Sequence, residues 1–164
     1  RYNGFMFFQG GGGAWFTYLK EAKTNTVVQT NLIHYLPSEV EEVKIEGSLD
    51  NFLMQMIVSR EAYITFDPEQ QNMGNLAISA LELSVSMKQI IGVLPIAACT
   101  KNITGCEGVA IKSCENADKP IIELRYAEDA KITQNSNCLL IEGKDKDLIK
   151  ATSRAIYGWY GIMN

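Results

Sequence analysis

The stretch that decides the fold is AYITFDPEQQNMGNLAISALELSVSMKQIIGVLPIAAC, residues 62–99. It opens with a short apolar run that Pro68 stops, and it closes with a second apolar run over residues 93–99. Between these runs, residues 72–91 have the three- and four-residue spacing of one helical face. The expected members of that face are Met73, Leu76, Ala77, Ala80, Leu81, Ser84, Met87, Lys88 and Ile91. Strand, helix and strand in so short a stretch predict a βαβ unit with parallel strands.

The residues that follow this unit continue in the same style. Strands are predicted over residues 120–126 and 138–143, with a shorter strand near residues 131–134. Residues 144–162 predict a closing helix. Its expected buried face consists of Leu148, Ile149, Thr152, Ala155, Ile156 and Trp159. Alternating strands and helices with short connections predict a three-layer α/β domain with a mostly parallel sheet and flanking helices.

The residues that precede the unit predict four further elements. AWFTYLKEAK, residues 14–23, is a candidate for a short helix. Residues 26–36, rich in β-branched and aromatic side chains, and residues 40–47 are expected as strands. A helix is expected over residues 49–60, capped by Ser48.

Residues 1–24 form an arm rich in aromatic residues and glycine, and residues 25–164 are expected to form one α/β domain. Aromatic side chains flank the glycine run of residues 10–13 on both sides. Because aromatic rings favour the membrane–water boundary, one interpretation is the membrane-proximal part of an anchored protein. The preferred alternative is a terminal arm that packs its aromatics on the domain, with the glycine run as a turn or linker.

Composition and charge restrict the function. The chain has 164 residues, of which 46% are hydrophobic and 21% charged, as in an ordinary globular domain. Its net charge of −4 and its scattered Lys and Arg residues argue against a nucleic-acid partner. No stretch reaches the roughly 18 uncharged apolar residues that cross a bilayer.

Four cysteines, at positions 99, 106, 114 and 138, lie in the second half of the chain. They are separated by six, seven and twenty-three residues, so no pair has the spacing of a zinc knuckle. The C-x-x-C motif of thiol oxidoreductases and the spacing of common ferredoxins are absent from the sequence as well. Two disulfides in an oxidising compartment fit this pattern best.

Three disulfide pairings are possible, and strand positions favour one of them. Cys99 ends a predicted strand and Cys106 lies in the next loop, so a bridge between them closes that loop. Cys114 precedes one predicted strand and Cys138 begins another, and the starts of adjacent parallel strands are neighbours. We therefore prefer Cys99–Cys106 with Cys114–Cys138, and leave the other two pairings open.

One candidate modification site lies between the first two cysteines. Asn102, Ile103 and Thr104 form an N-glycosylation sequon in a polar loop. Such a glycan is expected only outside the cytosol, as are the disulfides.

One candidate ligand site follows the first strand of the βαβ unit. Asp67 ends that strand, with Asn72 and Asn75 nearby, and ligands of open α/β sheets bind at the carboxyl ends of strands. An acidic residue here could hold a metal, a ribose hydroxyl or a substrate amine. The preferred alternative is structural: Asp67 is the N-cap of the long helix, Pro68 its first residue, and Gln70 completes a capping box.

No group of residues predicts catalysis. The glycine run lacks the Lys-Ser or Lys-Thr pair of a phosphate-binding loop, and no serine has a G-x-S-x-G context. The only histidine, His34, lies in a strand-like stretch and is expected to be a packed or surface residue. We assign no catalytic residue, no metal site and no cofactor.

Three segments carry a resemblance to known proteins. They are YITFDP (63–68), AACTKNITGC (97–106) and NCLLIEGKDKDLIKATSRAIYGWYGIM (137–163). Together they resemble membrane-anchored archaeal proteins of unknown function, in which an extracytoplasmic α/β domain follows an N-terminal transmembrane segment. The likeness covers residues 60–164 and implies an envelope location, without assigning a catalytic residue.

The sequence leaves three functional hypotheses. The first is a non-catalytic, disulfide-stabilised, extracytoplasmic domain that contacts an envelope or surface protein, or another copy of itself, with a membrane anchor outside this sequence as an open possibility. The second is a small-molecule-binding protein or enzyme that uses the strand ends near Asp67, Cys99 and Thr100. The third is a cytosolic metal or redox protein, which requires free or metal-bound thiols.

Overall fold

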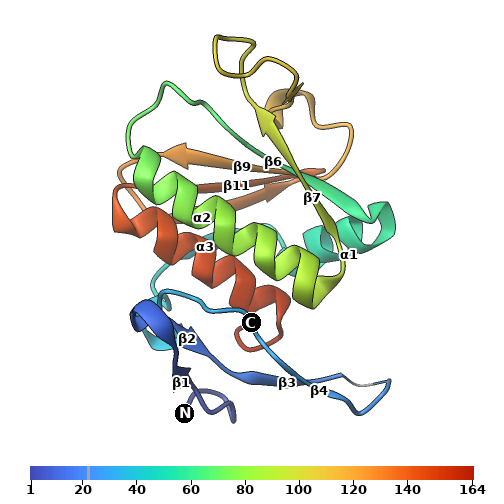
Figure 1. Cartoon of the computed structure of the whole chain (residues 1–164), viewed down its shortest axis with the longest axis vertical. Coiled ribbons are helices and arrows are strands. Elements are labelled where there is room, and N and C mark those ends of the chain that lie inside the picture. Colours follow the sequence, from blue (N-terminus) through green and yellow to red (C-terminus); the bar gives the residue numbers. More distant parts are fainter. Residues whose placement is uncertain (22) are drawn as a thin grey trace.

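A computed structural model of the chain describes residues 1–21 and 23–164. Its centre is a sheet of seven strands in the order β5-β10-β11-β9-β6-β7-β8 (Figure 1). The strands are β5 (Lys44–Glu46), β6 (Glu61–Phe66), β7 (Leu94–Cys99), β8 (Ala110–Ile111), β9 (Ile121–Tyr126), β10 (Lys131–Asn135) and β11 (Cys138–Gly143). Strands β6 to β9 and β11 run parallel to one another, whereas β10 and β5 run the opposite way. The sheet is therefore mostly parallel, as predicted.

Three α-helices lie together on one face of the sheet, α1 (Leu49–Ser59), α2 (Met73–Val85) and α3 (Lys146–Trp159). Helix α2 continues into a π-helical turn, η3 (Ser86–Ile91), and α3 packs against both α1 and α2 (Figure 1). Sheet and helices share one continuous apolar core. Its members include Phe52, Met56, Ile64, Leu76, Leu83, Ile122, Leu124, Leu139, Ile141, Leu148 and Ile156.

The opposite face of the sheet has a thinner cover. The segment 112–116, with the 3₁₀ turn η4 (Cys114–Asn116), lies over Thr65 and Glu123. The Thr65 hydroxyl donates to the Lys112 carbonyl at 2.8 Å, and the Cys114 N–H donates to Glu123 Oε1 at 3.0 Å. With this cover, the predicted α/β architecture of a mostly parallel sheet with flanking helices and two disulfides is confirmed.

The βαβ unit and the preferred disulfide pairing are also confirmed. Strands β6 and β7 are parallel neighbours joined through α2. Cys99 is bonded to Cys106 with a Cα–Cα distance of 6.2 Å, and Cys114 to Cys138 with 5.3 Å. Cys138 lies opposite Ile121 at the start of the β9–β11 pair, so the starts of these adjacent parallel strands are neighbours.

The buried residues of α2 match the expected helical face only in part. Leu81 is 64% exposed, whereas Glu82 and Leu83 beside it are buried. The reason is that α2 is covered on two sides. Its sheet side buries Leu83, and its other side carries Glu82 against the N-terminal part of the chain.

The described residues of the range 1–35 form an antiparallel structure that we call the N-terminal ribbon. Its strands are β1 (Phe8–Gln9), β2 (Trp15–Phe16), β3 (Tyr18–Lys20) and β4 (Val27–Gln29), with the glycine turn η1 (Gly11–Gly13) between β1 and β2. β1 pairs with β2, β3 pairs with β4, and Trp15 bridges to Ile33. A second 3₁₀ turn, η2 (Pro37–Glu39), follows the ribbon.

The helix expected over residues 14–23 is therefore wrong over its described residues, and the strand expected over 26–36 is mostly irregular. The physical reason is a two-residue alternation. Thr17 and Leu19 lie on the inner side of the ribbon, whereas Phe16 and Tyr18 form an aromatic cluster with Phe8 outside. Aromatic residues with this period suit a pleated strand.

The ribbon packs on the side of the helix layer that faces away from the sheet (Figure 1). The rings of Phe7 and Tyr157 of α3 pack edge to face with 5.9 Å between their centroids. The Asn3 side chain donates to the Ile162 carbonyl at 2.9 Å. Helix α3 is thus covered from two sides, which explains why its residues from Ala151 to Trp159 are all buried. Among the described residues, no helix combines the length and the apolar character that crossing a membrane requires.

Candidate functional site

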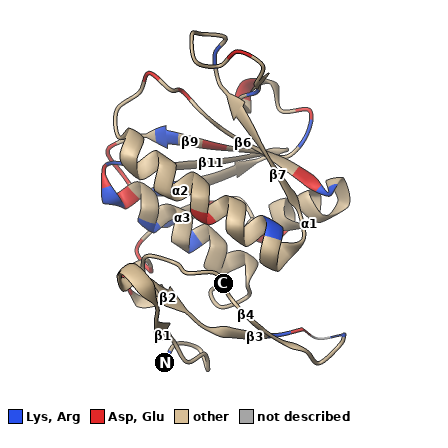
Figure 2. Cartoon of the chain, in the orientation of Figure 1, with Lys and Arg blue, Asp and Glu red and all other residues tan. Residues whose placement is uncertain are grey.

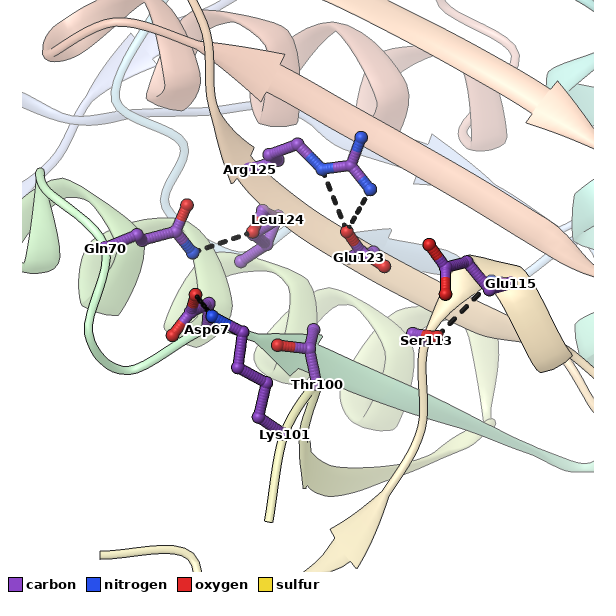
Figure 3. A pocket seen from close by; sticks show the side chains of 9 residues that line it. All are labelled: Asp67, Gln70, Thr100, Lys101, Ser113, Glu115, Glu123, Leu124 and Arg125. Atoms are coloured by element: carbon purple, nitrogen blue, oxygen red, sulfur yellow. Dashed lines mark hydrogen bonds and ion pairs between the residues drawn. The ribbon is translucent and has the colours of Figure 1, made fainter. Parts of the chain in front are cut away.

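A polar cavity of about 350 Å³ lies at the carboxyl edge of the parallel strands (Figure 3). Four adjacent strands contribute to it: β6, β7 and β8 through residues that follow their ends, and β9 through residues of its second half and Glu123 before them. Its lining consists of Asp67, Gln70, Thr100, Lys101, Ser113, Glu115, Glu123, Leu124 and Arg125. The volume falls within the range of pockets that hold small molecules.

The strand order explains why a cavity forms here. From β6 the chain moves to β7 and β8 on one side, and β9 then returns to the other side of β6. Connections that leave in opposite directions from neighbouring strands leave a crevice between their carboxyl ends, where ligands of α/β proteins bind. Asp67 follows β6 and Arg125 lies near the end of β9, so the two residues lie on opposite sides of this crevice.

The first of two ion pairs in the cavity joins Asp67 and Lys101. Asp67 Oδ2 lies 2.8 Å from Lys101 Nζ, and Oδ1 accepts the backbone N–H of Glu69 at 2.9 Å. These two contacts, first the Lys101 ammonium and then the N–H, hold the pKa of Asp67 below its ordinary value. Asp67 is therefore a carboxylate at neutral pH, and it is only partly buried.

The interpretation of Asp67 as the N-cap of the long helix is wrong. Helix α2 begins at Met73, and its N-cap position is occupied by Asn72. The reason is that Gln70 does not fold back on a helix: its side chain donates to the Leu124 carbonyl and accepts the Tyr126 N–H. Gln70 thus ties the loop to the end of β9, and Asp67 remains at the cavity.

The second ion pair joins Glu123 and Arg125, two residues apart on β9. Arg125 Nε and Nη2 both donate to Glu123 Oε2, at 3.0 and 2.6 Å. Glu123 is 5% exposed, and its other oxygen accepts the Cys114 N–H. The Arg125 side chain is 47% exposed, and no hydrogen bond among the described residues uses its Nη1. A ligand at the cavity can therefore reach a guanidinium that is already held in place.

Thr100 supplies a further polar group between the two ion pairs (Figure 3). Its hydroxyl oxygen is buried and has no hydrogen-bond partner among the described residues. The Ser113 hydroxyl oxygen accepts the Glu115 N–H at 3.3 Å, and Glu115 itself is exposed at the rim of the cavity. A buried hydroxyl without a partner costs free energy, so a ligand or water that pairs with Thr100 is favoured here.

The other residues singled out in the sequence lie elsewhere. Asn75 donates to the Asn72 side chain at 2.5 Å, and Asn72 donates to the Asp145 carbonyl at 3.2 Å, so these two asparagines join the start of α2 to the start of α3. Asn102 is exposed in the loop closed by Cys99–Cys106. His34 contacts Glu82 of α2 at the ribbon.

The sequence signal that was missed is a pair of charges inside an apolar strand. Glu123 and Arg125 interrupt the run of residues 120–126, and a buried strand of a parallel sheet is normally apolar. Among the described residues, no group of three or more His, Cys, Asp or Glu side chains is arranged to hold a metal ion. The site thus offers two cations, three carboxylates and hydroxyl groups in one small cavity.

Compared with known protein families, curated proteins and solved structures, the chain has no significant match.

Proposed function

We propose that this chain is a non-catalytic, extracytoplasmic binding domain whose carboxyl-edge cavity holds a small zwitterionic molecule. The observation that carries the proposal is the pair of ion pairs, Asp67–Lys101 and Glu123–Arg125, contributed to one cavity by adjacent strands. Cations and carboxylates within one small volume match a ligand that carries both an acidic and a basic group, such as a free α-amino acid.

The charge arrangement favours this class over ligands of one sign. A strongly anionic ligand would meet Asp67, Glu115 and Glu123, and a polycation would meet Lys101 and Arg125. A zwitterion can place its carboxylate at Arg125, where the planar guanidinium donates in a fork, and its ammonium at Glu115 or Asp67. Such a ligand adds no net charge to the site.

The extracytoplasmic part of the proposal rests on the cysteines and the sequon. All four cysteines form disulfides, which persist in oxidising compartments. Asn102 is exposed, as an acceptor of a glycan must be. The non-catalytic part rests on the lining, which has neither histidine nor free thiol: the single histidine is at the ribbon and the cysteines are paired.

The compartment is tested by intact mass after alkylation of natively produced protein, with and without reductant. We expect no alkylation before reduction and four alkylated cysteines after it. Free thiols before reduction would instead favour the cytosolic metal or redox hypothesis.

The ligand class is tested by NMR titration of the oxidised, ¹⁵N-labelled protein with free amino acids, each compared with its N-acetyl and its amide derivative. We expect shifts at the amides of Thr100, Lys101 and Arg125, larger for the zwitterions than for the derivatives. Arg125→Met should abolish them. Lys131→Met is the matched control, because Lys131 also pairs with a carboxylate, Glu46 at 3.0 Å, but on strands β10 and β5 at the other edge of the sheet.

Two results would contradict this proposal. Shifts that survive Arg125→Met unchanged, or the absence of shifts with every amino acid, would remove the zwitterion site. Chemical conversion of a bound amino acid during the titration would remove the non-catalytic assignment.

A further inference from the structure

The outward side of the N-terminal ribbon is an apolar surface that the other described residues leave uncovered. The two-residue alternation places Phe8, Phe16 and Tyr18 together, with ring centroids 5.6 to 5.9 Å apart. Val27 lies opposite Lys20 in the β3–β4 register, so it extends the same side of the ribbon. We call these residues, with the exposed Met6 and Leu32 of the same ribbon, the outer face.

The side chains of the outer face are too exposed to be part of the core. Phe8 is 43% exposed, Tyr18 46% and Val27 62%. Folded domains seldom leave aromatic rings in a cluster open to water unless another surface covers them. The inner side of the same strands, by contrast, packs on the helix layer through Phe7 and Leu19. Within the described part of the chain, the inner side of the ribbon therefore has a partner, the helix layer, and the outer face has none.

The charge of the ribbon differs in sign from the charge of the rest of the chain. Residues 1–35 contain Arg1, Lys20 and Lys23 against the single acid Glu21, a net charge of +2, so residues 36–164 carry −6 of the total of −4. Figure 2 shows the ribbon almost free of charged residues except near the loop that joins β3 and β4. An anionic surface would attract the ribbon and repel the remainder, which fixes the orientation of the domain.

The ribbon and the disulfide-closed loop lie at opposite ends of the molecule (Figure 1). Strand β7 runs away from the ribbon, and the loop closed by Cys99–Cys106 follows its carboxyl end. If the outer face lies on a surface, the carboxyl-edge cavity and Asn102 therefore point away from that surface. The two sites do not compete for space.

We infer that the outer face is a docking surface for an anionic lipid bilayer. Aromatic rings with lysines beside them are the side chains that settle at the membrane–water boundary, where the rings enter the headgroup region and the ammonium groups meet lipid phosphates. Among the described residues, another exposed apolar pair, Met54 and Val58 on α1, has no aromatic ring beside it and lies near both Asp118 and Lys119. This pair is as exposed as the outer face but lacks its aromatic rings, so it serves as the internal control.

The experiment is co-sedimentation of the oxidised protein with two kinds of vesicle, pure phosphatidylcholine and phosphatidylcholine mixed with phosphatidylglycerol. We expect binding to the mixed vesicles and weaker binding to the neutral ones. Phe8→Ser with Tyr18→Ser should weaken binding to the mixed vesicles by about tenfold or more. Lys20→Gln with Lys23→Gln should weaken binding to the mixed vesicles by about tenfold and leave binding to neutral vesicles unchanged.

Met54→Ser with Val58→Ser is the matched control and should bind as the unmodified chain does. All the substituted residues are exposed, so we expect every variant to fold. Circular dichroism and thermal unfolding check this for each variant. Three results would overturn the inference. The first is that the protein binds neither kind of vesicle. The second is that Met54→Ser with Val58→Ser weakens vesicle binding as much as Phe8→Ser with Tyr18→Ser does. The third is a dimer, measured by light scattering, that dissociates in Phe8→Ser with Tyr18→Ser. The last result would identify the occupant of the outer face as a second copy.

Discussion

The two sides of the helix layer are held by different chemistry. Toward the sheet the contacts are apolar without interruption, so that Phe52 of α1, Ile156 of α3 and Ile122 of β9 belong to one core. Toward the N-terminal ribbon, apolar contacts such as the buried Ile33 and the aromatic pair Phe7 with Tyr157 are combined with hydrogen bonds to buried polar groups.

We call this second set of contacts the polar latch. In α2, the buried Glu82 carboxylate accepts the His34 N–H at 2.9 Å and contacts the His34 ring. In α3, the Tyr157 hydroxyl donates to the Tyr35 carbonyl at 2.6 Å. Just after α3, the Tyr160 hydroxyl pairs with Ser86 and with Asn31 of the ribbon.

The difference separates two roles within one fold. Apolar burial is shared by all elements of the core, so a defect there lowers the stability of the whole domain. The polar latch joins one segment through directional bonds, so a defect there should free the ribbon and leave the sheet in place. The four predictions below test this separation, from the largest expected effect to the smallest.

The largest effect is expected from the apolar side. Phe52 is fully buried and stacks on Trp159 with 6.4 Å between ring centroids. Phe52→Ala should lower the free energy of unfolding by about 4 kcal/mol, because it removes the ring and leaves a cavity. Urea denaturation measures the loss, and hydrogen exchange should show sheet and ribbon amides losing protection together. Met54→Ala, on the exposed side of the same helix, should change the free energy of unfolding by less than about 0.5 kcal/mol.

The next effect concerns the staple that ties the thin cover of the sheet to its core. Cys114→Ala with Cys138→Ala opens a loop with a sequence separation of 24 residues and should cost about 3 kcal/mol, mainly by freeing the unfolded chain. Cys99→Ala with Cys106→Ala opens a separation of only 7 residues and should cost less, about 2 kcal/mol. Denaturation of both variants under non-reducing conditions gives the comparison. Equal losses would show that loop closure is not the main contribution.

The same contrast explains which parts of the structure could be predicted from the sequence. The βαβ unit, β9, β11 and α3 bury apolar side chains at regular spacing, and that spacing is readable along the chain. Strand adjacency then placed Cys114 beside Cys138. The ribbon was misread because a short stretch that contains Trp15, Leu19 and Lys20 can be matched to a helix as easily as to a strand.

The cavity could be predicted only in part. Asp67 was placed at a strand end correctly, because a strand end is a local feature. Glu123 and Arg125 were missed because their meeting with Asp67 depends on the insertion of β9 beside β6, and the sequence has no local signal for strand order. The buried Glu82 was missed for the same reason, since its partner His34 is 48 positions away.

Breaking the polar latch should separate the two sides of the helix layer. Glu82→Ala leaves the His34 N–H without its acceptor, which should cost about 1–2 kcal/mol. Hydrogen exchange should show faster exchange at ribbon amides such as Trp15 and Ile33, while the amides of β9 keep their protection. Leu81→Ala is the control, because Leu81 is adjacent in sequence but 64% exposed. If the β9 amides also exchange faster in Glu82→Ala, the ribbon is part of the cooperative core and the comparison fails.

The smallest effect is a pH dependence of the latch. The hydrogen bond to Glu82 raises the pKa of His34 above its ordinary value of 6.5, against a smaller opposite effect of burial. The stability that the charged ring contributes is therefore fully present below about pH 6.5 and is lost as the pH rises through the raised value. Tyr157 and Tyr160 also lie near Glu82. Burial raises the pKa of both hydroxyls above the ordinary value of 10.0, so both stay neutral over the pH range in which His34 titrates.

Because the His34 side chain is 43% exposed, we expect the contribution to stay below about 1 kcal/mol. Urea denaturation of the unmodified chain and of His34→Asn, from about pH 5 to about pH 8, measures it as the difference between the two curves. The difference should shrink toward high pH, and since His34 is the only histidine, no other imidazole contributes to it. A difference that is constant with pH would show that the ring acts as a neutral hydrogen-bond partner, and that the latch depends on its backbone N–H and tyrosine contacts alone.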